Sequence, residues 1–233
     1  MRKNALVLFY LFISFSLFAQ INVASKQIYL DSLGREATRE NYSYTRVFTN
    51  FSQKSDRFLV TDYYRSGRKK MTGTSLTKDV LKKEGEFVYY YKNGAKESSV
   101  NYSDDHKTGK EYNWYENQSM KSEKQNLWNP KTKTLQTLLI NFWNRDKEQL
   151  VIDGNGEYED TDPPFYEKGI IKNGVKQGVW QGSDTINNTS FTENYDKGVL
   201  LSGVSTDENN IKHPYASSKE KSILENNGRS IKK

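Results

Sequence analysis

The sequence contains no cysteine and only three methionines and two histidines among its 233 residues. Without thiols there can be no disulfide, no thiolate nucleophile, no cysteine-based zinc site and no iron–sulfur cluster. The two histidines, His106 and His213, lie in polar stretches that we interpret as solvated turns. The chain also lacks a nucleophile elbow, a phosphate-binding loop, a dinucleotide fingerprint and a His-Glu-x-x-His helix. We therefore expect no catalytic residue, no metal site and no cofactor.

A strong excess of one charge is also missing. The 35 basic and 29 acidic residues give a net charge of +6, and after residue 19 the balance is 33 against 29, a net +4. A balance this small and evenly spread argues against a nucleic-acid partner. Leu, Ile, Val and Phe form only about a fifth of the chain after residue 19, whereas tyrosine is abundant. Because aromatic residues favour strands, the composition predicts a tyrosine-rich, mostly β protein.

Long apolar runs are absent except at the N-terminus. There, Arg2 and Lys3 precede an apolar or hydroxyl run over 5–18, and a small residue stands before Gln20. This order of charge, apolar run and small residue is typical of a secretory signal peptide, which we place at 1–19. The mature chain would then lack a transmembrane segment and be periplasmic or extracellular. The alternative is that the apolar run is kept as an anchor.

Aromatic and turn-forming residues recur at a regular spacing. Two aromatics, two turn formers, a glycine or glutamine and a polar return occur at 63–69, 90–96 and 114–120, and the fifth positions are 27 and then 24 residues apart. Glycine-containing bends at 83–87 and 108–112 precede the next strand-forming runs. Each unit is therefore predicted to be a β-hairpin followed by a second turn.

Glycines mark the predicted turns. Gly67 follows serine and Gly94 follows asparagine, and in such dipeptides glycine accepts the positive φ that a tight hairpin requires. Related turns are expected at Gly174 and Gly198. With these turns, the repeat pattern extends in degraded form over about 28–205.

The repeat has an irregular middle and a polar end. Residues 121–148 depart from the pattern, although 134–142 is an uninterrupted β-prone run that we interpret as an inner strand, with a helix as the alternative. After residue 209 the chain loses apolar content. We therefore predict one repeat domain over 20–209 and a polar, disordered tail over 210–233.

One acidic segment has some features of a calcium loop. Asp153–Glu159 places oxygen-bearing side chains at alternate positions. Tyr158 stands where an EF-hand loop requires glycine, and Pro164 stands where it requires a bidentate glutamate. We interpret the segment as a hairpin turn, with an acidic patch at Asp160 and Asp162 that would hold a cation only weakly.

Three strings carry a resemblance to a known repeat family. KNGAK within 90–96, KNGVKQGVW at 172–180 and YDKGVLLSG at 195–203 resemble MORN-like repeats. They are more closely similar to the YwqK-type antitoxin repeats of secreted Bacteroidota proteins, which sometimes precede TonB-type domains. The resemblance implies antiparallel hairpins stacked into an elongated, twisted open sheet that serves as an interaction surface. This chain departs from the pattern at Gln118, where glycine is expected.

Side-chain alternation along a strand separates the two members of each aromatic pair onto opposite faces. The members with the more apolar neighbours, which we predict to form the core, are Tyr63, Tyr90 and Trp114. The other members, which form a candidate exposed binding ladder for a sugar ring, a peptide or a partner strand, are Tyr64, Tyr91 and Tyr115. The alternative is that these tyrosines pack only against one another and against lysine stems.

These features together predict a secreted, non-enzymatic scaffold of the bacterial cell envelope whose sheet binds another envelope protein. One alternative is a glycan-binding module that uses the tyrosine ladder to hold a surface glycan. The other, implied by the resemblance, is an accessory of a TonB-linked transport system or of a toxin-neutralising system.

Overall fold

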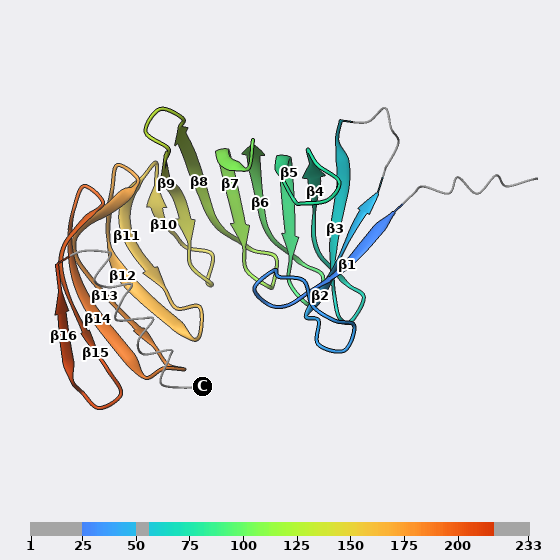
Figure 1. Cartoon of the computed structure of the whole chain (residues 1–233). Coiled ribbons are helices and arrows are strands. Elements are labelled where there is room, and N and C mark those ends of the chain that lie inside the picture. The colour runs from blue at the N-terminus through green and yellow to red at the C-terminus, as the bar shows by residue number, and fades with distance from the viewer. Residues whose placement is uncertain (1–24, 50–55, 217–233) are drawn as a thin grey trace, which may run out of the picture.

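A computed structural model describes residues 25–49 and 56–216, and the regular structure in these ranges is entirely antiparallel sheet. Sixteen strands form a single open sheet in which the spatial order, β1 to β16, is the order along the sequence. Figure 1 shows the hairpins following one another from β1 at one end to β16 at the other. The predicted fold class, stacked antiparallel hairpins in an elongated open sheet, is confirmed.

The strands of the N-terminal half are β1 (Lys26–Leu30), β2 (Tyr44–Thr49), β3 (Phe58–Tyr64), β4 (Lys69–Ser75), β5 (Lys83–Tyr90), β6 (Lys96–Ser103), β7 (His106–Trp114) and β8 (Met120–Asn129). Those of the C-terminal half are β9 (Thr134–Trp143), β10 (Gln149–Ile152), β11 (Asn155–Asp160), β12 (Phe165–Lys172), β13 (Val175–Asp184), β14 (Thr189–Asp196), β15 (Val199–Thr206) and β16 (Lys212–Tyr215).

Two kinds of tight turn recur among the connections between these strands. Between β5 and β6, Gly94 N donates to Tyr91 O at 2.9 Å and Tyr91 N donates to Ala95 O at 2.9 Å. Between β12 and β13 the turn has only two residues, with positive φ at both Asn173 and Gly174, which matches the twist of the flanking strands. The predicted turn glycines all have positive φ, between 79° and 94°: Gly67, Gly94, Gly174 and Gly198.

The turn at Gln118, where the repeat pattern predicts glycine, keeps the same geometry. Gln118 has a φ of 70°, and its N donates to Tyr115 O at 2.8 Å, as in the turn of Gly94. The departure from the repeat pattern at this position therefore changes the residue but not the turn. A side chain in this left-handed conformation costs about 1–2 kcal/mol, which the surrounding hairpin must offset.

The two kinds of turn should respond differently to the same substitution. At Gly94 an added Cβ meets open space, so Gly94→Ala should cost only the strain of positive φ, about 1 kcal/mol. At Gly174 an added Cβ would lie 2.8 Å from the Leu138 Cβ. Gly174→Ala should therefore cost roughly 2–4 kcal/mol, the sum of strain and overpacking. Urea unfolding of both variants measures this difference, and equal penalties would contradict the turn packing described here.

The irregular middle does not interrupt the sheet. β8 pairs with β9 over nearly its whole length, from Ser122↔Phe142 to Asn129↔Thr134, with one bulge near Lys124. The prediction of a strand over 134–142 is confirmed, and the alternative of a helix is wrong. The departure from the repeat therefore lies in side-chain character and not in strand pairing.

The sheet continues beyond residue 209, where the prediction placed the start of a disordered tail. β16 pairs with β15 from Gly203↔Tyr215 to Thr206↔Lys212. The Tyr215 ring is 4% exposed, and its hydroxyl donates to Glu193 Oε1 at 2.8 Å. The strand is therefore held by main-chain pairing with β15 and by one buried aromatic residue in otherwise polar sequence. The predicted signal peptide (1–19) and the rest of the tail (217–233) lie outside the described residues.

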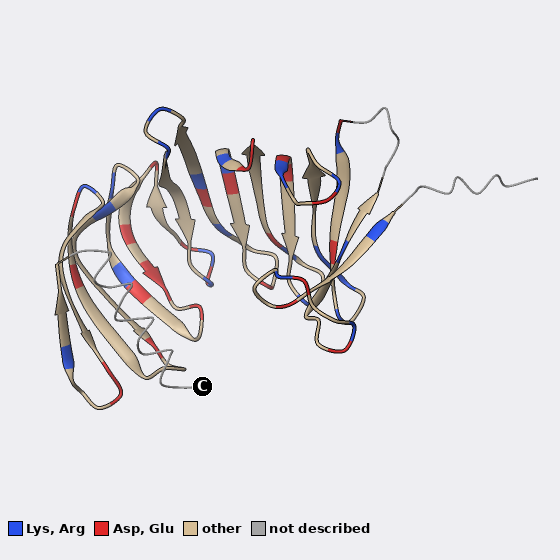
Figure 2. Cartoon of the chain, viewed as in Figure 1, with Lys and Arg blue, Asp and Glu red and all other residues tan. Residues whose placement is uncertain are grey.

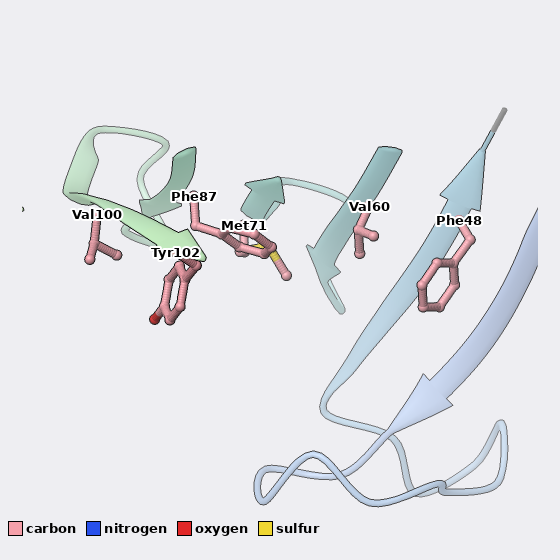
Figure 3. Packing of buried hydrophobic residues seen from close by; sticks show 6 residues of the cluster. All are labelled: Phe48, Val60, Met71, Phe87, Val100 and Tyr102. Carbon is pink, nitrogen blue, oxygen red and sulfur yellow. The ribbon is translucent and has the colours of Figure 1, made fainter. Parts of the chain in front are cut away.

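The described residues bury two apolar clusters on the sheet. The N-terminal cluster, shown in Figure 3, consists of Phe48, Val60, Met71, Phe87, Val100 and Tyr102. The C-terminal cluster consists of Phe142, Val151, Ile171 and Trp180. Each cluster takes residues from several successive strands, so neighbouring hairpins stabilise one another. Of the residues in 25–49 and 56–216, none forms a helix long and apolar enough to cross a membrane.

The alternation of faces was predicted correctly, but the core was assigned to the wrong face. On the face of Tyr115, the Tyr115 and Val60 side chains are 1% exposed and Asp62 is 2% exposed. Trp114, on the opposite face, is half-buried. Tyr63 and Tyr90, also predicted as core, are half-buried as well. The physical reason is that the charged residues on the Tyr115 face were read as solvent-facing, but they are buried and paired.

Candidate functional site

The three tyrosines predicted to form an exposed ladder occupy equivalent positions just beyond β3, β5 and β7 or at their ends. Their hydroxyls donate to main-chain carbonyls of the next hairpin: Tyr64 to Tyr90 O at 2.7 Å, Tyr91 to Trp114 O at 2.8 Å and Tyr115 to Trp143 O at 3.0 Å. Burial raises the pKa of all three phenols. The ladder therefore links successive hairpins through its own polar atoms.

Cations lie over two of the three rings of this ladder, those of Tyr115 and Tyr64. Lys121 Nζ and the Arg145 guanidinium carbon lie 5.0 Å and 5.2 Å from the centroid of the Tyr115 ring. Lys70 Nζ lies 6.0 Å from the centroid of Tyr64. The prediction of an exposed ladder is wrong for the buried Tyr115, and Tyr64 and Tyr91 are half-buried. The contacts favour the alternative interpretation, in which the tyrosines pack against lysine side chains.

A cavity of about 660 Å³ lies on the inner face of the curved sheet. Residues from β6 to β13 line it, for example Asn113 of β7, Lys124 of β8 and Lys176 of β13. Strands that are far apart in the sheet can line one cavity only because the sheet bends around it. Its volume lies within the roughly 300–1,000 Å³ typical of small-molecule sites.

The inner face beside this cavity has a polar centre, because side chains of β7 and β8 separate the two apolar clusters. Glu111, Ser122 and Asn126 are 6%, 3% and 1% exposed. Asn126 Nδ2 donates to Glu111 Oε2 at 3.0 Å, and Lys107 Nζ donates to the same oxygen at 2.9 Å. Thr137 Oγ1 donates to Asn126 Oδ1 at 2.7 Å. Buried polar groups are expensive unless they are satisfied in this way, so a polar centre in a core is a candidate functional feature.

The polar centre contains one cation without an acidic partner. Lys124 faces the cavity from β8, between Glu111 of β7 and Leu139 of β9. Within the described part of the chain its ammonium forms no ion pair, and the carboxylate of Glu111, directly opposite on β7, is bound by Lys107 and Asn126. Burial lowers the pKa of the Lys124 amine, and Lys107 and Lys121 lower it further, whereas Glu111 and Asp160 act in the opposite direction.

Glu111 is held as a carboxylate. Burial by itself would raise its pKa, but the hydrogen bonds from Lys107 and Asn126 and the charges of Lys107 and Lys124 outweigh burial and lower it. The negative charge needed by this network is therefore present at neutral pH.

Apart from Glu97, the other charged groups that line the cavity are held in ion pairs. Lys121 Nζ lies 2.8 Å from Asp160 Oδ2 and 2.9 Å from Asp162 Oδ2. Arg145 also pairs with Asp162, and Lys176 pairs with Glu167. The acidic patch predicted at Asp160 and Asp162 is thus neutralised by side chains of the protein itself. Figure 2 shows basic and acidic residues interspersed along the strands.

The remaining sequence-derived candidates lie elsewhere. Asp153 and Gly154 form the two-residue turn between β10 and β11, with φ of 48° and 78°, so the hairpin interpretation of this segment is confirmed. His106 stacks on Trp128 at a centroid distance of 3.7 Å, and His213 Nε2 lies 3.0 Å from Asp207 Oδ2. The described residues contain no group of three or more acidic or imidazole side chains placed to hold a metal.

Lys124→Met should stabilise the protein. The substitution replaces a half-buried, unpaired charge by an apolar chain of similar length, which should raise the free energy of unfolding by about 1–2 kcal/mol at pH 7. The folded-state pKa of Lys124 is lowered, so the unfolded chain binds more protons between the two pKa values. The gain in the free energy of unfolding should therefore be complete below the pKa of Lys124 in the folded protein. It should vanish above the pKa of Lys124 in the unfolded chain.

Urea unfolding at several pH values measures this gain. Lys168→Met provides the matched control, because Lys168 is exposed on β12 and should change stability by less than about 0.5 kcal/mol. A loss of stability in Lys124→Met would mean that its ammonium contributes to the fold.

Sequence reasoning did not find this polar centre, although a signal was present. Ser122, Lys124 and Asn126 alternate on β8 and share its inner face. They lie in the segment 121–148, which departs from the repeat pattern and which we interpret from the sequence only as an irregular middle of the repeat domain. Searches against models of protein families and against curated proteins find no match to this chain, so the geometry of the cavity is the basis for a functional proposal.

Proposed function

We propose that this protein is a secreted, non-catalytic binding scaffold of the cell envelope, and that its ligand occupies the cavity on the inner face of the sheet. The observation that carries the proposal is the polar centre, where the protein maintains a buried network and an unpaired lysine between two apolar clusters. An apolar side chain at these positions would stabilise the sheet more, so the polar residues point to a binding role.

The size of the cavity supports a small ligand or a short segment of a polymer. The polar groups beside it include carboxylates, amides and hydroxyls from separate strands, which is the mixture that orients a polar ligand. The tyrosine ladder predicted to bind a glycan contributes Tyr91 to the lining, and its hydroxyl is already bonded to Trp114 O. The proposed binding surface is therefore the cavity and not the ladder.

Screening against glycan and peptide arrays tests this proposal. Glu97 is exposed and lines the cavity, so Glu97→Trp should reduce binding by at least about tenfold if the added ring blocks access, a change of about 1.4 kcal/mol. Glu157→Trp is the matched control on the opposite face of β11, where Glu157 is also exposed. Equal binding by both variants would place the ligand site outside the cavity.

A protein partner on the outer face is the second candidate. Exposed apolar side chains occur there on neighbouring strands: Ile170 of β12 and Val179 of β13 are 44% and 59% exposed. If this surface carries the interaction, Val179→Asp should abolish capture of an envelope protein while Glu97→Trp leaves it unchanged. That result would replace the inner-face proposal by the interaction scaffold expected from the sequence.

A further inference from the structure

We propose that the cavity binds a sugar that carries a single carboxylate, such as a uronic acid, with the carboxylate on the Lys124 ammonium. This inference rests on the proposed function, because it assigns a ligand class to the same cavity.

The charges around the cavity favour one negative group. Lys121 and Lys176 are both engaged by carboxylates of the protein, which leaves Lys124 as the cation available to a ligand among the described lysines of the lining. A ligand carboxylate would compensate a charge that is otherwise half-buried without a partner, and such charge-assisted hydrogen bonds are stronger than neutral ones. A single ammonium can compensate one negative charge, as on a carboxylate, but not the two of a phosphate.

The acids around the cavity disfavour a polyanion. Asp160, Asp162 and Glu167 already pair with Lys121 and Lys176, so these lysines are not available to a second negative group on the ligand. Glu97 also lines the cavity and would repel such a group. Carboxylate oxygens accept hydrogen bonds from hydroxyl groups, as do the hydroxyls of Ser122 and Thr137, which also line the cavity. A ligand with one carboxylate and several hydroxyls satisfies both conditions, and a sugar acid has this composition.

The topology disfavours an extended peptide. A peptide usually gains affinity from a sheet by adding a strand to an unpaired edge. Every strand from β6 to β13 has a neighbour on both sides, so the lining of the cavity offers no such edge. Recognition here must use side chains, as it does for sugars in a concave site.

Titration with two matched sugars tests the proposal. Methyl β-D-glucuronide and methyl β-D-glucoside differ only at C6, which is a carboxylate in the first and a hydroxymethyl group in the second. Amide chemical shifts in NMR spectra of the purified protein report both affinity and location. We expect the glucuronide to bind at least about tenfold more tightly than the glucoside and to shift resonances of β7 to β9. Lys124→Met should weaken glucuronide binding by at least about tenfold, whereas Lys168→Met should match the unsubstituted protein. Thermal unfolding of Lys124→Met shows whether that variant remains folded.

The possible results separate the steps of the inference. Equal affinity for the two sugars would overturn the role of Lys124 while leaving the cavity as a binding site. Acetate binding as tightly as the glucuronide would overturn the sugar and leave a simple anion site. No binding of either sugar would overturn the ligand class, and the arrays with Glu97→Trp would then decide separately whether the cavity binds another ligand.

Discussion

Tyr115→Ala should destabilise the protein by roughly 3–5 kcal/mol, whereas Trp114→Ala should cost less than about 2 kcal/mol. The Tyr115 ring is 1% exposed beneath Lys121 and Arg145, and its hydroxyl binds Trp143 O at 3.0 Å. Removing the side chain leaves a cavity and takes the Tyr115 hydrogen bond away from the Trp143 carbonyl at the end of β9. Trp114 is larger but only half-buried, so its removal leaves less of a void.

Equilibrium urea unfolding of the two variants tests this order. Tyr115→Phe separates the two contributions of the residue, because it keeps the ring and removes the hydroxyl, at an expected cost of about 1 kcal/mol. If Trp114→Ala were the more destabilising substitution, the core would lie on the face that the sequence first indicated. The assignment of the cavity to the buried inner face would then be wrong.

The error in choosing the core face has a clear physical origin. The period of two along each strand gave the correct grouping of Tyr64, Tyr91 and Tyr115, and the turn glycines gave the correct hairpins. Which face is buried depends on the partners of its charged residues, and those partners lie on neighbouring strands. Asp62 and Glu111 look solvent-facing in the sequence, but Arg46 and Lys107 pair with them in the fold.

The curvature of the sheet was a second feature that the sequence did not reveal. Each hairpin is local and is predicted from its turn. The cavity, however, joins Asn113 of β7 to Lys176 of β13 and to Gly198 in the turn between β14 and β15, and β7 pairs with none of these strands. The bend accumulates from the twist of each strand pair and from bulges, such as the one between Val100 and Asn101. No sequence pattern within a single repeat specifies the total bend of the sheet.

Glycines inside strands show how the core accommodates its large rings. A Cβ on Gly73 would lie 2.5 Å from the Phe87 ring, and one on Gly169 would lie 2.4 Å from the Trp180 ring. Each ring therefore lies across the backbone of the preceding strand, where a side chain would otherwise stand. Gly182 and Gly203 show the same close approach, and in all four cases the aromatic partner follows 9–14 residues later in the sequence.

Asp62→Ala should also cost roughly 3–5 kcal/mol, because it leaves a largely buried guanidinium without its partner. Arg46 and Asp62 are directly opposite on β2 and β3, and their side chains are 13% and 3% exposed. Two parallel hydrogen bonds join them, Nε to Oδ1 at 2.8 Å and Nη2 to Oδ2 at 2.9 Å. The pair lies beside Phe48 and Val60 in the N-terminal cluster, so little water can replace the lost carboxylate.

A double-mutant cycle separates the net contribution of the ion pair to stability from the destabilisation caused by leaving one charge buried without its partner. Replacing both residues by apolar ones, Arg46→Met with Asp62→Leu, should recover most of the loss and bring stability to within about 1–2 kcal/mol of the original chain. Urea unfolding of the two single variants and the double variant measures the coupling. If Asp62→Ala alone costs less than about 1 kcal/mol, the pair is solvated as an exposed ion pair would be. The description of the inner face as buried, with paired charges, would then be wrong for the N-terminal half of the sheet. The Lys124 site was inferred from that description.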